Sequence, residues 1–197
     1  MDIVELLDVV DAQGNPLNLV KPRHLVHRDG DWHKTVHIWI KNYKGELLLQ
    51  KRSSEKESFP DFWDISSAGH IQAGQTSVFA AIQEVREELG IVLEKKELNY
   101  LFTIRACFKK TGGDFIDNEI SDVYVVTKNV FLSDLHLQKE EISEARWMSV
   151  DDLKKALLSE AQNFVPHNEE YEKLFSNEGF HCDMNGRVAS LGSKKPS

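Results

Sequence analysis

The sequence predicts an α/β fold of three layers, an α/β/α sandwich in which helices cover both sides of a mixed central sheet. Two observations lead to this prediction. Strand-like segments and helical segments are mixed along one chain, which is typical of α/β domains. The chain has 197 residues, enough for one domain with its own core, and no repeat or low-complexity linker divides it.

The first third of the chain reads mainly as strands. Residues 3–10 have the alternating pattern of a strand, and residues 13–16 (QGNP) favour a turn. Residues 32–41 alternate again, and 46–52 pair back on them as a hairpin. After a polar loop, residues 64–68 form a short strand.

A strong helix is predicted from Thr76 to Leu89. Thr76 or Ser77 can cap its start, and Gly90 can end it. Beyond this helix we expect strands at 98–108, 120–130 and 144–149, and helices at 150–161 and about 167–176.

These elements make one domain over residues 1–184, with its core at about 30–160. The tail at 185–197 is small, polar and basic, and we expect it to be disordered.

The charge and composition narrow the possible partners. A net charge of -8 argues against a nucleic-acid polymer, whose phosphates attract basic surfaces. A small phosphate ligand stays possible, because divalent cations can neutralise its charge. No apolar run suits a membrane span, and the acidic N-terminus does not resemble a secretory signal. The two cysteines, Cys107 and Cys182, are too few for a disulfide framework, and we expect Cys107 to be buried. We therefore expect a cytoplasmic protein, either a monomer or a homodimer.

Three glutamates share one face of the helix at 76–89. Glu84, Glu87 and Glu88 are three and four residues apart, so their side chains project together. Like charges at this spacing repel one another, and a divalent cation that prefers oxygen ligands would compensate. A solvated acidic face is the alternative. The core side of the helix is a separate apolar stripe: Val78, Ile82, Val85 and Leu89.

The flanks of this helix favour the metal interpretation. The stretch from Gly69 to Ile91, GHIQAGQTSVFAAIQEVREELGI, resembles the Nudix box, G-x5-E-x7-R-E-U-x-E-E-x-G-U, where U is a bulky apolar residue. Two positions depart from the box, since Gln75 replaces its first glutamate and Gln83 replaces its arginine. The positions that agree are Gly69, Glu84, Val85, Glu87, Glu88, Gly90 and Ile91. The wider resemblance runs from about residue 30 to about 160.

This resemblance implies a Nudix fold and a hydrolase. Glu84, Glu87 and Glu88 would be catalytic and would bind Mg²⁺, with Mn²⁺ as a possible substitute. Water would attack phosphorus in the diphosphate linkage of a small molecule, either a nucleoside diphosphate derivative or a related organic diphosphate. Gly69 and Gly90 would serve the structure of the motif. Because both substitutions in the box lie outside the metal-ligand set, we expect reduced or altered activity rather than none.

A narrower resemblance points to type I isopentenyl-diphosphate isomerase, itself a Nudix-fold enzyme. It runs through three segments: WHKTVHIWIKNYKGELLLQKR, FPDFWDISSAGH and FIDNEISDVY. His33 and His70 match metal-binding histidines of that enzyme, and His27 lies near the position of a third. Asp117 and Glu119 stand at the positions of its two glutamates.

The isomerase activity itself is the disfavoured alternative. Ala68 occupies the position of the catalytic cysteine, and alanine cannot donate or relay the proton that moving a double bond requires. A third hypothesis is a non-catalytic protein that binds nucleotides or diphosphates, supported only by Gln75 and Gln83.

Four further residues are candidates for the site. Arg52 ends a strand, and its planar guanidinium suits phosphate oxygens, although it could also be an exposed strand-end charge. His33 and His70 could contact substrate or metal, or only satisfy local hydrogen bonds. Glu119 is the candidate general base, expected in a loop that faces the glutamate helix, with a surface position as the alternative.

Overall fold

The computed structural model describes residues 4–111, 115–159 and 163–177. The end of the predicted domain at 184, the predicted disordered tail at 185–197 and Cys182 lie outside these residues.

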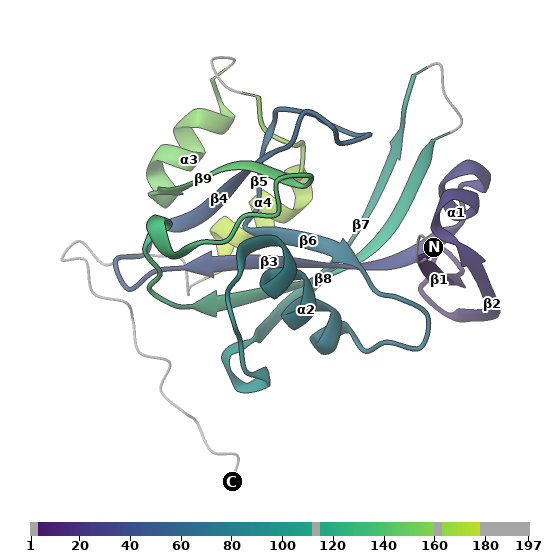
Figure 1. Ribbon diagram of the computed structural model, residues 1–197. Coiled ribbons are helices and arrows are strands. Elements are labelled where there is room, and N and C mark those ends of the chain that lie inside the picture. The colour runs from purple at the N-terminus through teal and green to yellow at the C-terminus, as the bar shows by residue number, and fades with distance from the viewer. Residues whose placement is uncertain (1–3, 112–114, 160–162, 178–197) are drawn as a thin grey trace, which may run out of the picture.

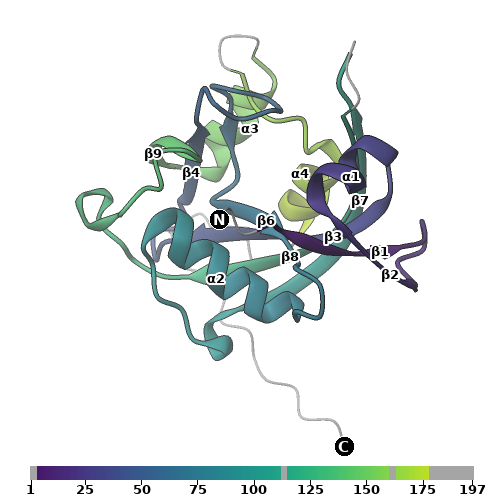
Figure 2. The same cartoon turned by 45° about the vertical axis from the view of Figure 1, so that its right-hand side comes forward.

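The described residues form nine strands and four α-helices (Figures 1 and 2). The strands are β1 (Leu6–Val10), β2 (Pro16–Pro22), β3 (Trp32–Lys41), β4 (Leu47–Arg52), β5 (Trp63–Asp64), β6 (Ser67–His70), β7 (Asn99–Lys109), β8 (Ile116–Thr127) and β9 (Ile142–Met148). The helices are α1 (Arg23–Asp29), α2 (Ser77–Leu89), α3 (Val150–Leu157) and α4 (Asn168–Ser176). Two short 3₁₀ turns cover Lys95–Glu97 and Leu132–Asp134.

Strand β3 organises a mixed sheet. Along one edge it pairs in parallel with β8 over its whole length. Its other pairings are antiparallel and follow one another along the strand: β1 at Trp32, β6 at Thr35 to Ile38, and β4 at Lys41. Strands β5 and β9 extend the sheet from β4, and β7 extends it from β8. This arrangement brings β6 and β8 to the two sides of the middle of β3.

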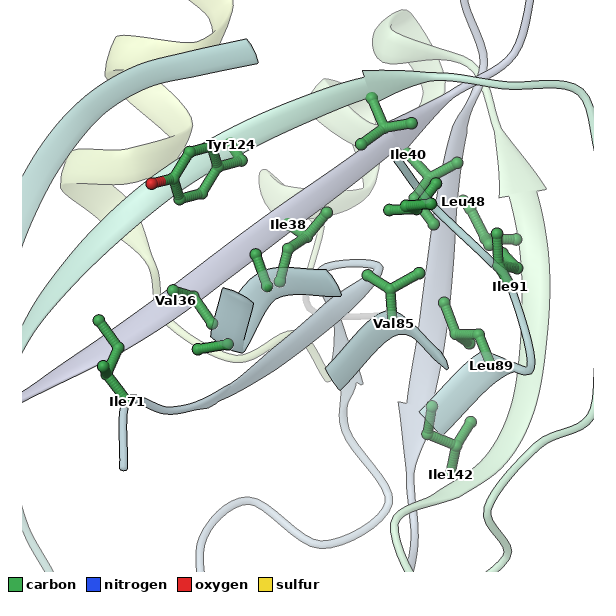
Figure 3. Packing of buried hydrophobic residues seen from close by; sticks show 14 residues of the cluster. Val36, Ile38, Ile40, Leu48, Ile71, Val85, Leu89, Ile91, Tyr124 and Ile142 are labelled. Carbon is green, nitrogen blue, oxygen red and sulfur yellow. The ribbon is translucent and has the colours of Figure 1, made fainter. Parts of the chain in front are cut away.

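Helices cover both faces of the sheet, as the sequence predicts. On one face, Val85 and Leu89 of α2 pack against Val36, Ile38 and other apolar residues of the sheet (Figure 3). On the other face, a second cluster packs α3 and α4 against the sheet, and it includes Trp39, Leu153, Tyr171 and Leu174. The three-layer α/β/α arrangement with a mixed sheet is confirmed.

Two N-terminal elements, β2 and α1, were not expected. Strand β2 is an edge strand bounded by two prolines and is mostly exposed, so it lacks the apolar alternation of a half-buried strand. Helix α1 has seven residues, too few to show a clear helical period. The helix predicted at 150–161 ends at Leu157. Cys107, expected to be buried, is exposed on β7.

Among the described residues, no helix is both long and apolar enough to span a membrane.

Candidate active site

Helix α2 holds the three candidate glutamates beside β6. The Thr76 hydroxyl accepts a hydrogen bond from the Phe79 N–H at 3.4 Å, and Gly90 ends the helix with a left-handed φ of 73°. The close approach of the helix to β6 depends on Gly69. A Cβ on this residue would lie 2.1 Å from Cδ of Glu84, so a glycine is required here.

Burial and neighbouring carboxylates dominate the electrostatics of Glu84 on α2. Burial, with help from Glu88 and Glu87, raises the pKa of Glu84 to about 8. The charged groups with the largest effect on Glu84 are all carboxylates: Glu88, Glu87, Glu5 and Glu141. Burial also raises the pKa of Glu88 to about 7, although the Ser67 hydroxyl donates to its carboxylate at 2.6 Å. A bound cation would let both groups ionise.

The two glutamines that depart from the sequence motif are joined by hydrogen bonds. The Gln72 N–H donates to Oε1 of Gln75 at 3.0 Å, and Nε2 of Gln75 donates to Oε1 of Gln83 at 2.9 Å. Nε2 of Gln83 then donates to Oε1 of Glu87 at 2.9 Å. The amides therefore form a neutral chain that ends on a candidate metal ligand.

A second group of side chains converges on the other side of β6. His27, His33 and His70 each place a ring nitrogen within 4.8 Å of the others, and so do the ligand atoms of His33, Asp117 and Glu119. Nε2 of His33 lies 3.5 Å from Oδ1 of Asp117 and 4.0 Å from Oε1 of Glu119. This group is called the histidine cluster below.

Several polar atoms of the histidine cluster are buried without a hydrogen-bond partner: Nε2 of His27, Nε2 of His33 and Oδ1 of Asp117. Burial and the neighbouring His70 lower the pKa of His33 to about 4, so its ring is neutral and able to ligate a metal. Buried polar atoms normally have partners. A set of imidazoles and carboxylates with open atoms fits a divalent transition metal.

The structure separates the predicted residues into two groups. Glu84, Glu87 and Glu88 are not among the sets of described residues whose ligand atoms lie within 4.8 Å of one another. We expected Glu119 in a loop that faces α2, but it does not lie there. It lies within β8, and the parallel register of β3 and β8 pairs it with His33. Burial and the nearby Asp117 raise the pKa of Glu119 to about 8.

A pocket of about 210 Å³ adjoins the histidine cluster. Ala68, Gly69, His70 and Glu119 are among the residues that line it. Arg52 also lines the pocket, where its NH1 donates to Oδ2 of Asp64 at 3.0 Å and its Nε to the Ser58 carbonyl at 3.1 Å. Arg52 is therefore not the exposed strand-end charge of the alternative interpretation.

Sequence reasoning missed four residues in and behind this pocket. His37, Asp64 and His167 line it, and Glu170 lies buried behind His37. One signal was available, because polar side chains recur at every second position of the strand at 32–41 and so share a face with His33. No sequence signal connects His167 and Glu170 to that strand.

Comparison with protein families matches residues 31–167 to the NUDIX domain. "Nudix hydrolase 3" of Arabidopsis thaliana is 41% identical over 97% of this chain, and the match spans 25% of the plant protein. An uncharacterized Nudix hydrolase of Listeria monocytogenes is 42% identical over 70% of this chain and 75% of its own length. The chain thus spans only about a quarter of the length of the plant relative.

More distant relatives bear out the second resemblance. An isopentenyl-diphosphate Delta-isomerase of Citrobacter koseri is 27% identical over 80% of this chain and 84% of its own length. Among solved structures, DR0079 of Deinococcus radiodurans has a similar fold, with a TM-score of 0.66 and 22% identity over 86% of this chain and 98% of that one.

Proposed function

The chain belongs to the Nudix family of hydrolases, and we propose that it cleaves the diphosphate linkage of a small organic diphosphate with the help of Mg²⁺ or Mn²⁺. The observation that supports this most is the environment of Glu84. It is largely buried, and the charges that act on it most strongly are other carboxylates. Such a cluster is costly without a cation and well suited to a hard divalent ion.

In this proposal Glu84, Glu87 and Glu88 hold the cation. When bound, the cation would polarise the phosphoryl oxygens and offset negative charge on the leaving phosphate. The Ser67 hydroxyl orients Glu88, and the Gln83 amide orients Glu87.

The histidine cluster would hold a second divalent cation through His27, His33, His70 and Asp117. Glu119, beside this cluster, is the proposed general base, and its carboxylate would accept a proton from the attacking water. Ser58 accepts from Nε and NH2 of Arg52, and Asp64 accepts from NH1, so Arg52 would contact the substrate's phosphate with the second hydrogen of NH1. His33 and His70 would then reach the substrate through the cation rather than directly.

The test is phosphorus NMR on a panel of nucleoside diphosphate derivatives and isoprenoid diphosphates with Mg²⁺ or Mn²⁺. We expect cleavage that stops in EDTA and falls by about a hundredfold or more in Glu87→Gln and Glu88→Gln. Glu172→Gln, a matched change at an exposed position of α4, should keep full activity. If the panel yields no product at any metal concentration, the chain is not the proposed hydrolase.

The same panel separates the two alternatives. Interconversion of isopentenyl and dimethylallyl diphosphate without phosphate release would indicate an isomerase, which Ala68 opposes. Tight metal-dependent binding without turnover would indicate a non-catalytic binding protein.

A further inference from the structure

His37 presents a hydrogen-bond donor at one end of the pocket. It lies next to Ala68 in the β3–β6 pairing and lines the cavity. Its Nδ1 is 2.7 Å from Oε2 of Glu170, and the other oxygen of Glu170 accepts from Nε1 of Trp39, also at 2.7 Å. Burial opposes a charge on His37, but Glu170 raises its pKa to about 9. The ring is therefore an imidazolium near neutral pH, and both of its nitrogens are donors.

The second nitrogen of His37 has no protein partner among residues 4–111, 115–159 and 163–177. Glu170 occupies the Nδ1 edge, so Nε2 is the donor left for a molecule in the pocket. An N–H group at the pocket wall can donate to a bound molecule, so this end of the pocket favours a ligand with an acceptor atom.

His167 forms a second pair of this kind beside the first. Its Nε2 is 2.8 Å from Oδ1 of Asp64, and the two imidazole rings are 5.1 Å apart. Burial opposes ionisation of Asp64, but His167 and Arg52 together lower its pKa. Asp64 is therefore an ionised carboxylate that fixes the ring of His167 at the pocket wall.

We propose that the end of the pocket formed by His37 and His167 binds the part of the substrate that carries no phosphate, through a hydroxyl or carbonyl oxygen. This deepens the proposed function, because it makes the substrate a diphosphate of an oxygen-bearing organic group rather than of a plain alkyl chain. The physical reason is that such a site discriminates strongly against a substrate that lacks the oxygen. A site built to hydrogen-bond an oxygen rejects the analogue that lacks it, because the site's own polar groups are then left unpaired.

The aromatic part of the pocket does not supply this selectivity. Phe59, Phe108 and Phe115 also line the cavity, and their rings contact one another at centroid distances of 4.7 and 6.4 Å. Such rings accept alkyl and hydroxylated groups alike. We assign the choice between the two kinds of substrate to the two histidine–carboxylate pairs.

The test compares two ligands that differ by one oxygen: dimethylallyl diphosphate and the same molecule with a terminal hydroxyl group. Their affinities are measured by titration calorimetry with Ca²⁺ in place of Mg²⁺. For the wild-type protein we expect the hydroxylated ligand to bind at least about tenfold more tightly. Because the calorimetry measures binding, the result does not depend on turnover. A lack of turnover would contradict the proposed hydrolysis but not this inference.

Two variants test the residues. His167→Phe keeps a ring and leaves Asp64 paired with Arg52 and with the Ile65 N–H, so the fold should persist. The double variant His37→Phe with Glu170→Gln removes the Nε2 donor of His37 and leaves no buried carboxylate without its partner. Each should bring the affinity ratio close to one, whereas His24→Phe, at an exposed position, should leave it unchanged. Equal wild-type affinities, no binding of the hydroxylated ligand, or an unchanged ratio in both variants would overturn the inference.

Discussion

At the scale of single residues, Gln83 stands where the Nudix box has an arginine, and it joins two other side chains by hydrogen bonds. Its amide links Gln75 to Glu87, and each hydrogen bond of that link is 2.9 Å long. A hydrogen bond to an ionised group contributes about 1.5–3 kcal/mol. Since Gln75 is also neutral, the pair leaves no uncompensated charge beside the candidate metal ligands.

Replacing Gln83 should weaken metal-dependent hydrolysis without abolishing it. Gln83→Ala frees Glu87 to turn away from the cation site, so we expect the Mg²⁺ requirement to rise and kcat/KM to fall by about fivefold to thirtyfold. Mg²⁺ titrations of the initial rate would measure both. Arg86→Ala, an exposed change on the same helix, serves as the control. Indistinguishable rates for the two variants would show that the amide chain does not position Glu87.

At the scale of an element, α2 combines a stable apolar face with an unstable acidic one. Val85 and Leu89 are fully buried in the core between helix and sheet. The pKa values of Glu84 and Glu88, about 8 and about 7, lie above their usual value of 4.5. Between pH 4.5 and these raised pKa values, the folded protein therefore holds more protons than the unfolded chain. The contribution of both groups to stability is present below pH 4.5 and is lost as pH rises through 7 to 8.

Metal-free protein should therefore lose thermal stability as the solution becomes alkaline. Between about pH 6 and about pH 8.5 we expect Tm in EDTA to fall by several degrees, at about 2–4 °C for each kcal/mol. Saturating Mg²⁺ should reduce this fall, because it favours the ionised carboxylates. Glu84→Gln should also reduce it, whereas Glu172→Gln should not. The measurement is calorimetry at both pH values, and a fall of equal size with and without Mg²⁺ would contradict the assignment.

At the scale of the whole molecule, a polar contact across the core joins α4 to β3. Glu170 is fully buried and accepts hydrogen bonds from Trp39 and His37, two neighbours on the same face of β3. Tyr171 and Leu174 of the same helix add apolar contact with the cluster around Trp39. The helix thereby connects the C-terminal part of the described chain to the central strand.

Removing that carboxylate should destabilise the entire fold. Glu170→Ala leaves the His37 imidazolium and the Trp39 N–H without a partner, and breaking a buried charged pair from one side costs about 3–5 kcal/mol. We expect Tm to fall by about 6–20 °C in a calorimetric scan. Glu172→Ala, on the exposed side of the same helix, should stay within about 2 °C of the wild type. A small change in Glu170→Ala would show that α4 is held by its apolar residues alone.

The features that depend on local pattern could be predicted from the amino-acid sequence. Apolar alternation and a helical stripe indicated the sheet, α2 and the three layers, and helical spacing put Glu84, Glu87 and Glu88 on one face. The spacing of the glycines and glutamates was enough to indicate the Nudix family. Each of these features is set by residues a few positions apart, and short-range geometry is legible in a sequence.

Which distant residues share the pocket depends on how the chain folds in three dimensions. The parallel β3–β8 register placed Glu119 beside His33 instead of facing α2, and the return of α4 brought His167 and Glu170 to His37. Glu170 is 133 residues from His37, and a contact over that separation depends on how strands and helices pack, which no local pattern records. The glutamate motif of α2 was therefore readable from the sequence, while the polar end of the pocket became apparent only when the chain was folded.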